Sequence, residues 1–196
     1  PGISDPGFVM VRAAQDAEIP IEIIPGPCAP IAALVGSGLP TDRFSFEGFL
    51  PRKSGAREKL LQALASEART LIFLESPHRA EQTLADLRRI FGEQREAAIA
   101  REVTKRFESI HRAPLGELVS WVAEDPVRCK GEIVLVVAGQ TMEATPSRVL
   151  EVAETLLAEL PPSQAARLTA NLTRQSRRTC YDVIQSIAKS RSSGDT

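Results

Sequence analysis

The sequence predicts an α/β domain with a largely parallel or mixed sheet, followed by a small helical subdomain. Up to Gly139, short apolar runs alternate with segments of helical periodicity, as strands and helices do in an α/β domain. From residue 147 onward only helical periodicity remains. The last two expected helices are joined by about three residues, Arg174–Ser176, and this pair resembles a helix-turn-helix hairpin.

The first expected elements are a helix over residues 7–18, a strand over 19–24 and a helix over 28–37. Proline and glycine residues separate them, because neither residue type continues a regular element easily. An apolar run over 44–49 predicts a second strand. The breaker-rich segment 51–55 that follows predicts a loop.

The alternation continues through the middle of the chain. Apolar stripes predict the helices, and short apolar runs predict the strands. The expected elements are, in chain order, a helix at 56–67, a strand at 70–74, a helix that starts at Ser76 and ends at Gly92, strands at 97–100 and 107–112, a helix at 115–122 and a strand at 133–137. The last of these is the most apolar strand.

The chain changes character after Gly139. Residues 140–147 are polar and predict a linker, and three helices are expected at 147–160, 163–173 and 177–189. The final residues, 191–196, are Ser-rich and predict a frayed tail.

Composition excludes several classes of protein. Lys and Arg number 24 against 25 Asp and Glu, so a generally basic nucleic-acid binder is excluded but a locally basic one is not. Three separated cysteines form no disulfide framework, which favours a reducing cytoplasm. The two histidines, His78 and His111, lie near no cysteine, so no metal site is expected. No apolar run approaches the ~20 residues that span a bilayer, so no membrane partner is expected.

The segment Leu74-Glu75-Ser76 is the first candidate ligand site. An apolar strand ends at Glu75, and Ser76 followed by Pro77 is a typical helix start. Ligands of α/β sheets bind at the carboxyl ends of strands, and the N–H groups of a helix start favour an anion. An ordinary strand-to-helix turn explains the same pattern, so both interpretations stay open.

The segment Arg101–Arg106 is the second candidate, because four titratable side chains follow a buried strand. Glu75 or Glu102 could serve as a general base, although nothing in the sequence establishes a raised pKa. The alternative is a solvated loop with surface ion pairs.

The C-terminal helices carry a charge asymmetry. Between residues 163 and 191, Asp182 alone opposes six basic residues: Arg167, Arg174, Arg177, Arg178, Lys189 and Arg191. A basic helical hairpin on a nearly neutral chain suggests a contact with nucleic acid. A solvated helix face explains it equally well.

Seven motifs occur in an order that resembles a known family. They are Ile3-Ser4-Asp5-Pro6-Gly7, Pro25-Gly26-Pro27, Gly38-Leu39-Pro40-Thr41-Asp42-Arg43-Phe44, Glu47-Gly48-Phe49-Leu50-Pro51-Arg52-Lys53, Glu75-Ser76-Pro77-His78-Arg79, Arg101-Glu102-Val103-Thr104-Lys105 and Gly131-Glu132-Ile133-Val134-Leu135-Val136. Together they resemble the bacterial 16S ribosomal RNA (cytidine-2′-O)-methyltransferases of the tetrapyrrole methylase superfamily. The resemblance covers nearly the whole chain, including the helical tail.

The resemblance implies S-adenosylmethionine, bound in a cleft between two α/β domains, as the methyl donor. It implies methyl transfer to a ribose 2′-hydroxyl of a cytidine in the 16S rRNA of the small ribosomal subunit, and it implies a homodimer. Aligning the hydroxyl with the methyl group and removing a proton would be the main tasks of the protein.

The resemblance also assigns candidate residues. The candidates near the cofactor are Ser4, Asp5, Pro25, Gly26, Pro27, Leu74, Glu75 and Ser76. The candidates for ordering substrate or moving the proton are Arg101, Glu102 and Lys105. The candidates for contact with RNA are Arg52, Lys53, Arg167, Arg174, Arg177 and Arg178.

Against this family, a segment of about 90 residues, within the range of a small domain, is expected to be missing before Pro1. Four parts are therefore expected: the remnant of an N-terminal α/β cofactor domain at 1–40, a C-terminal α/β methylase domain at 41–140, a helical subdomain at 146–190 and the tail. Helices 7–18 and 28–37 are expected to lack most of the sheet they should cover. The chain alone is expected to bind S-adenosylmethionine weakly or not at all.

Two other functions remain open at this point. A small-molecule methylase of the same superfamily would need no basic helical tail. A non-catalytic RNA-binding or assembly module would need no cofactor cleft.

Overall fold

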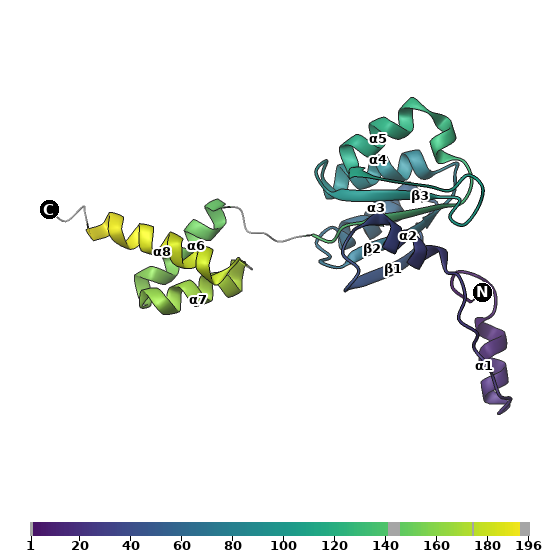
Figure 1. The fold of residues 1–196 in the computed structure, drawn as a ribbon, viewed down its shortest axis with the longest axis horizontal. Helices are drawn as coiled ribbons and strands as arrows, with labels where there is room; N and C mark the ends of the chain where they lie inside the picture. The colour runs from purple at the N-terminus through teal and green to yellow at the C-terminus, as the bar shows by residue number, and fades with distance from the viewer. Residues whose placement is uncertain (1, 141–145, 174, 193–196) are drawn as a thin grey trace. The chain divides into compact units, whose positions relative to one another are not determined.

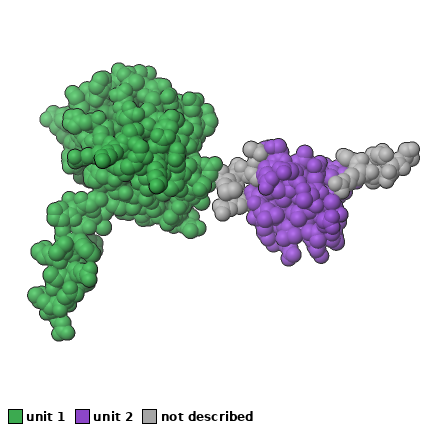
Figure 2. Space-filling view, turned by 180° about the vertical axis from the view of Figure 1, so that it is seen from behind, with its two compact units in different colours: residues 1–140 green, residues 141–196 purple. Residues whose placement is uncertain are grey.

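The computed structural model describes residues 2–140, 146–173 and 175–192. The chain forms two compact units, residues 1–140 and residues 141–196 (Figure 2). Within the described residues, the helices are too short or too polar to cross a membrane.

A five-stranded mixed sheet forms the centre of the first unit (Figure 1). Its strands, in spatial order, are β1 (Phe44–Phe49), β2 (Thr70–Glu75), β5 (Ile133–Val137), β3 (Glu96–Arg101) and β4 (Ser109–Pro114). β1 and β2 run parallel, and every other neighbouring pair is antiparallel. The mixed α/β sheet that the sequence predicts is confirmed, with element ends that differ by a few residues.

Three helices cover one face of the sheet: α3 (Ser54–Leu64), α4 (Ala80–Phe91) and α5 (Leu115–Glu124). Side chains alternate along each strand, so one set of each strand's apolar residues faces these helices. The core on this face includes Leu61, Leu84, Leu87, Leu115, Leu118, Leu71, Phe73, Ile99 and Leu135. A short 3-10 helix, η1 (Pro126–Cys129), lies between α5 and β5.

Helix α2 (Ala29–Ser37) covers the opposite face. Its residues Ala33 and Leu34 are fully buried against the alternate strand residues, which include Ile72 and Val136. The expectation that helix 28–37 lacks most of its sheet is therefore wrong, because α2 packs on the strands of this unit. Each face of the sheet thus has its own apolar cover.

The segment before α2 is less tightly packed. Helix α1 (Phe8–Asp16) has no buried residue. The predicted strand at 19–24 does not form, and that segment has no regular structure. Its apolar side chains are exposed, from 37% for Ile21 to 82% for Ile24. An apolar run becomes a strand only where a neighbouring strand accepts its backbone hydrogen bonds.

The predicted helix start at Ser76 is also wrong. Residues 77–79 form a turn, and α4 begins at Ala80. The turn is closed by hydrogen bonds from the N–H groups of Arg79 and Ala80 to the carbonyl of Ser76. The Ser76 hydroxyl accepts from the Arg79 guanidinium at 3.3 Å, so it caps no backbone N–H of the helix.

The second unit contains three helices among its described residues: α6 (Pro146–Glu159), α7 (Pro162–Thr173) and α8 (Arg177–Ser192). Small residues such as Ala165 and Ala166 let the helices approach closely around Ile184. The α7–α8 pair forms the predicted helical hairpin. Residues 141–145 of the predicted linker and 193–196 of the predicted tail lie outside the described residues.

Candidate functional site

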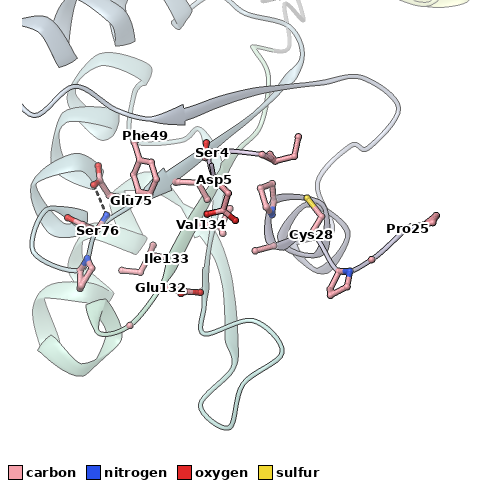
Figure 3. A pocket seen from close by; sticks show the side chains of 18 of the residues that line it. Ser4, Asp5, Pro25, Cys28, Phe49, Glu75, Ser76, Glu132, Ile133 and Val134 are labelled. Atoms are coloured by element: carbon pink, nitrogen blue, oxygen red, sulfur yellow. Dashed lines mark hydrogen bonds between the residues drawn. The ribbon is translucent and has the colours of Figure 1, made fainter. Parts of the chain in front are cut away.

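A cavity of about 740 Å³ opens where β2 ends and β5 begins (Figure 3). Its walls come from residues 3–5, from 23–30, from 74–77 and from 131–134, with Phe49 at the end of β1. The carboxyl ends of the parallel strands β1 and β2 thus meet at this cavity. That position is the usual ligand edge of an α/β sheet.

All eight residues predicted to lie near a cofactor line this one cavity. They are Ser4, Asp5, Pro25, Gly26, Pro27, Leu74, Glu75 and Ser76. They come from three segments of the chain that are distant in sequence, so their convergence is a property of the fold. Their role in binding a cofactor stays a prediction.

Sequence reasoning missed other lining residues, among them Phe49, Cys28, Glu132 and Ile133. Glu132 and Ile133 belong to the last of the seven motifs, so their position in that motif was the available signal. Phe49 belongs to the fourth motif, which offers the same signal, and Cys28 directly follows the second motif. Cys28 is half-buried.

Glu75 is a buried carboxylate whose oxygens all have partners. Its Oε1 receives the Arg79 guanidinium at 2.6 Å and the backbone N–H of Ser76 at 2.7 Å. Its Oε2 accepts from the Thr83 hydroxyl at 2.8 Å. These partners compensate for the burial of the charge. Because they tie the end of β2 to Ser76, Arg79 and Thr83, Glu75 holds this wall of the cavity in place.

Arg79 connects this wall to the loop that follows β1. Besides pairing with Glu75, it donates to the backbone carbonyl of Leu50 at 3.1 Å. From the other side, the Arg57 guanidinium reaches the carbonyl of Arg52 at 3.5 Å and forms a buried pair with Asp86 at 2.7 Å. The loop that carries the predicted RNA contacts is thus held at two carbonyls.

The predicted catalytic residues Arg101, Glu102 and Lys105 lie beside the cavity and do not line it. Arg101 donates to the Ser109 hydroxyl at 3.2 Å. Glu102 Oε1 accepts from the backbone N–H of Glu132 at 2.7 Å and from Lys105 Nζ at 3.1 Å. Lys105 Nζ also lies 2.9 Å from Glu132 Oε2. Glu132 lines the cavity, so this cluster contacts its rim.

These contacts fix the charges of the cluster. The hydrogen bond from the Glu132 N–H, and then the Lys105 ammonium, lower the pKa of Glu102 below its ordinary value. The carboxylates of Glu132 and Glu102 raise the pKa of Lys105. A carboxylate with a lowered pKa is a weak base, and a protonated amine cannot accept a proton. The arrangement suits ordering a substrate better than removing its proton.

The backbone around the cluster is constrained. Glu102 and Thr104 have positive φ angles of 50° and 68°, and Gly131 has a φ of 87°. A Cβ atom at Gly131 would overlap the Glu102 carboxylate. Glycine adopts this φ without strain, and a larger residue would also have to displace the Glu102 carboxylate from its hydrogen bonds.

The predicted RNA contacts lie on both units. Arg52 and Lys53 are exposed in the loop after β1, and Arg167, Arg177 and Arg178 are exposed on α7 and α8. Arg174 lies outside the described residues. Within the described part of the chain, no group of three His, Cys, Asp or Glu side chains could hold a metal ion.

Two family descriptions match this chain, and the second covers the helical hairpin. The family described as "Tetrapyrrole (Corrin/Porphyrin) Methylases" matches residues 1–119. The chain belongs to the tetrapyrrole methylase family. A second family, described as "RsmI C-terminal HTH domain", matches residues 143–187, which contain the predicted hairpin.

Curated relatives of this chain confirm the resemblance found in the sequence. "Ribosomal RNA small subunit methyltransferase I" of Pseudomonas aeruginosa is 51% identical over 88% of this chain. The protein of the same name from Escherichia coli O157:H7 is 49% identical over 88% of this chain. The chain spans 63% and 61% of the lengths of these two relatives.

A solved structure supports the fold of the tetrapyrrole methylase. The crystal structure of the methyltransferase CobJ matches with a TM-score of 0.53 and 22% identity. The match covers 71% of this chain and 61% of that one.

Proposed function

We propose that the protein containing this chain transfers a methyl group from S-adenosylmethionine to a ribose 2′-hydroxyl of a cytidine in 16S rRNA. The observation that carries the proposal is the cavity at the β2–β5 edge, where eight residues predicted from the methylase motifs converge. The names of relatives that are 49–51% identical support an rRNA substrate. The small ribosomal subunit is the proposed target, and a homodimer in the cytoplasm is the proposed working form.

The residues of the cavity fit S-adenosylmethionine. A volume of about 740 Å³ lies within the range of roughly 300–1,000 Å³ of ligand sites. Phe49 and Ile133 offer apolar surface for the adenine ring. The lining also carries the carboxylates of Asp5, Glu75 and Glu132, of which Glu75 and Glu132 pair with Arg79 and Lys105. Lys, Arg and His are absent from the described lining residues, which suits a ligand with two cationic centres.

S-adenosylmethionine supplies a methyl carbon activated by a positively charged sulfur. The ribose 2′-oxygen forms the new C–O bond, the C–S bond breaks, and the hydroxyl proton leaves for a base or for solvent. The protein must hold the ribose beside the cavity and exclude competing water. We assign the ordering of the RNA strand to Arg101 and Lys105, with Glu102 as the carboxylate that fixes the Lys105 ammonium. No residue is assigned as the general base.

Exposed cations on both units support contact with RNA. Arg177 and Arg178 occupy the first turn of α8, which has no acidic residue there. The helix dipole disfavours cations at that end by about 0.3–1 kcal/mol each. The fold therefore gains no stability from two cations at this helix end, whereas an RNA phosphate there would pair with both.

The test is methyl transfer from labelled S-adenosylmethionine to undermethylated small ribosomal subunits, catalysed by a protein that contains this chain and has the full length of the relatives. Nucleoside digestion locates the label. Label on a cytidine 2′-oxygen is the expected result. Cofactor binding without label on RNA would overturn the substrate and favour a small-molecule methylase.

We further propose that the chain of 196 residues binds S-adenosylmethionine weakly by itself. Helix α1 and the segment before α2 leave apolar side chains exposed, so the cavity wall formed by residues 23–27 lacks firm packing. Calorimetric titration measures this directly. Binding at micromolar affinity would contradict the proposal.

A further inference from the structure

The loop between β3 and β4, residues 102–108, presents an aromatic ring to solvent beside the cavity. The Phe107 side chain is 62% exposed. It belongs to none of the core clusters among the described residues. Exposing a phenyl ring forfeits up to about 3 kcal/mol of burial, so the fold gains nothing from Phe107 at this position.

The loop is held rigidly, which distinguishes Phe107 from a side chain on a loose surface segment. The N–H of Lys105 donates to the carbonyl of Glu102 at 2.9 Å, and the N–H of Glu108 donates to the carbonyl of Lys105 at 3.1 Å. The Glu108 carboxylate accepts from the N–H of Thr104. Backbone contacts therefore fix the positions on both sides of Phe107.

Positive charge accompanies the ring. The Arg106 guanidinium lies 5.5 Å from the centroid of the Phe107 ring, within the ~6 Å range of a cation–π contact. Lys105, one residue before Arg106, adds a second cation to the loop, where Glu102 and Glu132 hold it. A flat apolar ring flanked by cations matches a nucleotide, which combines a flat base with an anionic phosphate.

The β3–β4 loop that carries Phe107 contacts the rim of the cavity. The N–H of Glu102 donates to the carbonyl of Glu132 at 2.9 Å, and Lys105 Nζ pairs with the Glu132 carboxylate. Glu132 lines the cavity. A nucleotide on the loop would thus be a near neighbour of any ribose held at the cavity rim.

We propose that Phe107 and Arg106 form a stacking platform for an unpaired base of the RNA substrate. The inference rests on the proposed function, because it assumes that RNA reaches the cavity. The base must be unpaired, since the faces of bases inside an A-form duplex are covered by their neighbours. The platform holds the strand on one side while the reacting ribose enters the cavity.

The test compares an unstructured fluorescein-labelled RNA dodecamer with the same backbone carrying abasic riboses, by fluorescence anisotropy on the chain of 196 residues. Stacking of one base is worth about 1–3 kcal/mol, or roughly 5- to 150-fold in affinity. Phe107→Leu should weaken binding of the intact RNA by at least 5-fold and leave the abasic RNA unchanged. Phe107→Trp should restore the affinity.

Phe8→Leu is the matched control, because Phe8 is 69% exposed on α1 and does not line the cavity. Equal losses on the intact and abasic RNAs, or no loss with Phe107→Leu, would overturn the platform and leave the proposed RNA substrate standing. A chain that binds neither RNA would overturn the platform together with the proposed RNA contacts of this chain.

Discussion

Glu102 organises the rim of the cavity through its contacts with neighbouring residues. One carboxylate oxygen accepts from the Glu132 N–H and from Lys105, and the space beside it is closed to any side chain at Gly131. The β3–β4 loop and the start of β5 are thus joined through Glu102, Lys105 and Glu132. Replacements at this junction should disturb both the fold and the site.

Gly131→Ala should destabilise the chain by about 1–3 kcal/mol, because a positive φ is strained for alanine and the new Cβ meets the Glu102 carboxylate. Urea unfolding at pH 7 measures the change. Gly55→Ala is the control, since Gly55 lies in α3 with no neighbouring atom within 4 Å of the added Cβ. The control should be neutral or stabilising by up to about 1 kcal/mol. Equal effects of the two replacements would contradict the prediction.

The lowered pKa of Glu102 predicts a stability difference that depends on pH. A group whose pKa is lower in the folded than in the unfolded chain stabilises the fold above its unfolded pKa, about 4.3 for Glu, and this contribution is lost as the pH falls through the folded pKa. The free energy of unfolding of the wild type should exceed that of Glu102→Gln at pH 7. The excess should shrink in acid below about pH 4.3.

Urea unfolding at several pH values between 7 and 3 follows this excess. Glu22→Gln, at an exposed position before α2, is the control. An excess that stays constant into acid would show that the contacts of Glu102 contribute nothing through its charge.

At the scale of elements, the sequence predicts whether a helix or strand forms better than it predicts where the element ends or which elements it packs against. The central strands of the sheet were predictable because burial on both faces leaves continuous apolar runs such as Ile133–Val137. The false strand at 19–24 is also rich in isoleucine, but it contains Pro20 and Glu22 and has no strand to pair with. Periodicity carries no information about partners. The helix start at Ser76 failed because the ion pair of Arg79 with Glu75 favours a turn before α4.

Helix α2 should contribute strongly to stability, contrary to its expected lack of a sheet. Leu34 is 1% exposed against the sheet, so Leu34→Ala should cost about 2–5 kcal/mol. Val35 on the same helix is 67% exposed, and Val35→Ala should change stability by less than about 0.5 kcal/mol. Chemical denaturation of both variants measures the difference. Similar small effects would mean that α2 is not firmly docked in solution.

At the scale of the whole molecule, the site was predictable only in part. The eight cavity residues could be found because they lie in motifs at strand ends, where sheets bind ligands. Glu132 and Phe49 also lie in motifs, but their place on the cavity wall depends on the strand order. That order, with β5 between β2 and β3, is set by long-range pairing. Phe107 lies in no motif, so nothing in the sequence marked it.

The two units of the chain should contribute separately to RNA binding. Each phosphate contact changes the slope of log affinity against log salt by about 0.7 on single-stranded RNA. Arg52→Gln with Lys53→Gln in the first unit should therefore reduce the slope by about 1.4, and Arg177→Gln with Arg178→Gln in the second unit by a similar amount. The effects of independent contacts with one RNA are additive, so the slope should fall by about 2.8 in the variant that carries all four substitutions.

Fluorescence anisotropy between 50 and about 200 mM salt, a range over which such contacts strongly affect affinity, measures these slopes. Arg12→Gln with Lys59→Gln is the matched control, because it removes two exposed cations outside the proposed RNA contacts. A slope that falls for the control as much as for either pair would mean that net charge alone governs binding. A fourfold variant that loses no more than one pair would mean that only one unit contacts the RNA at a time.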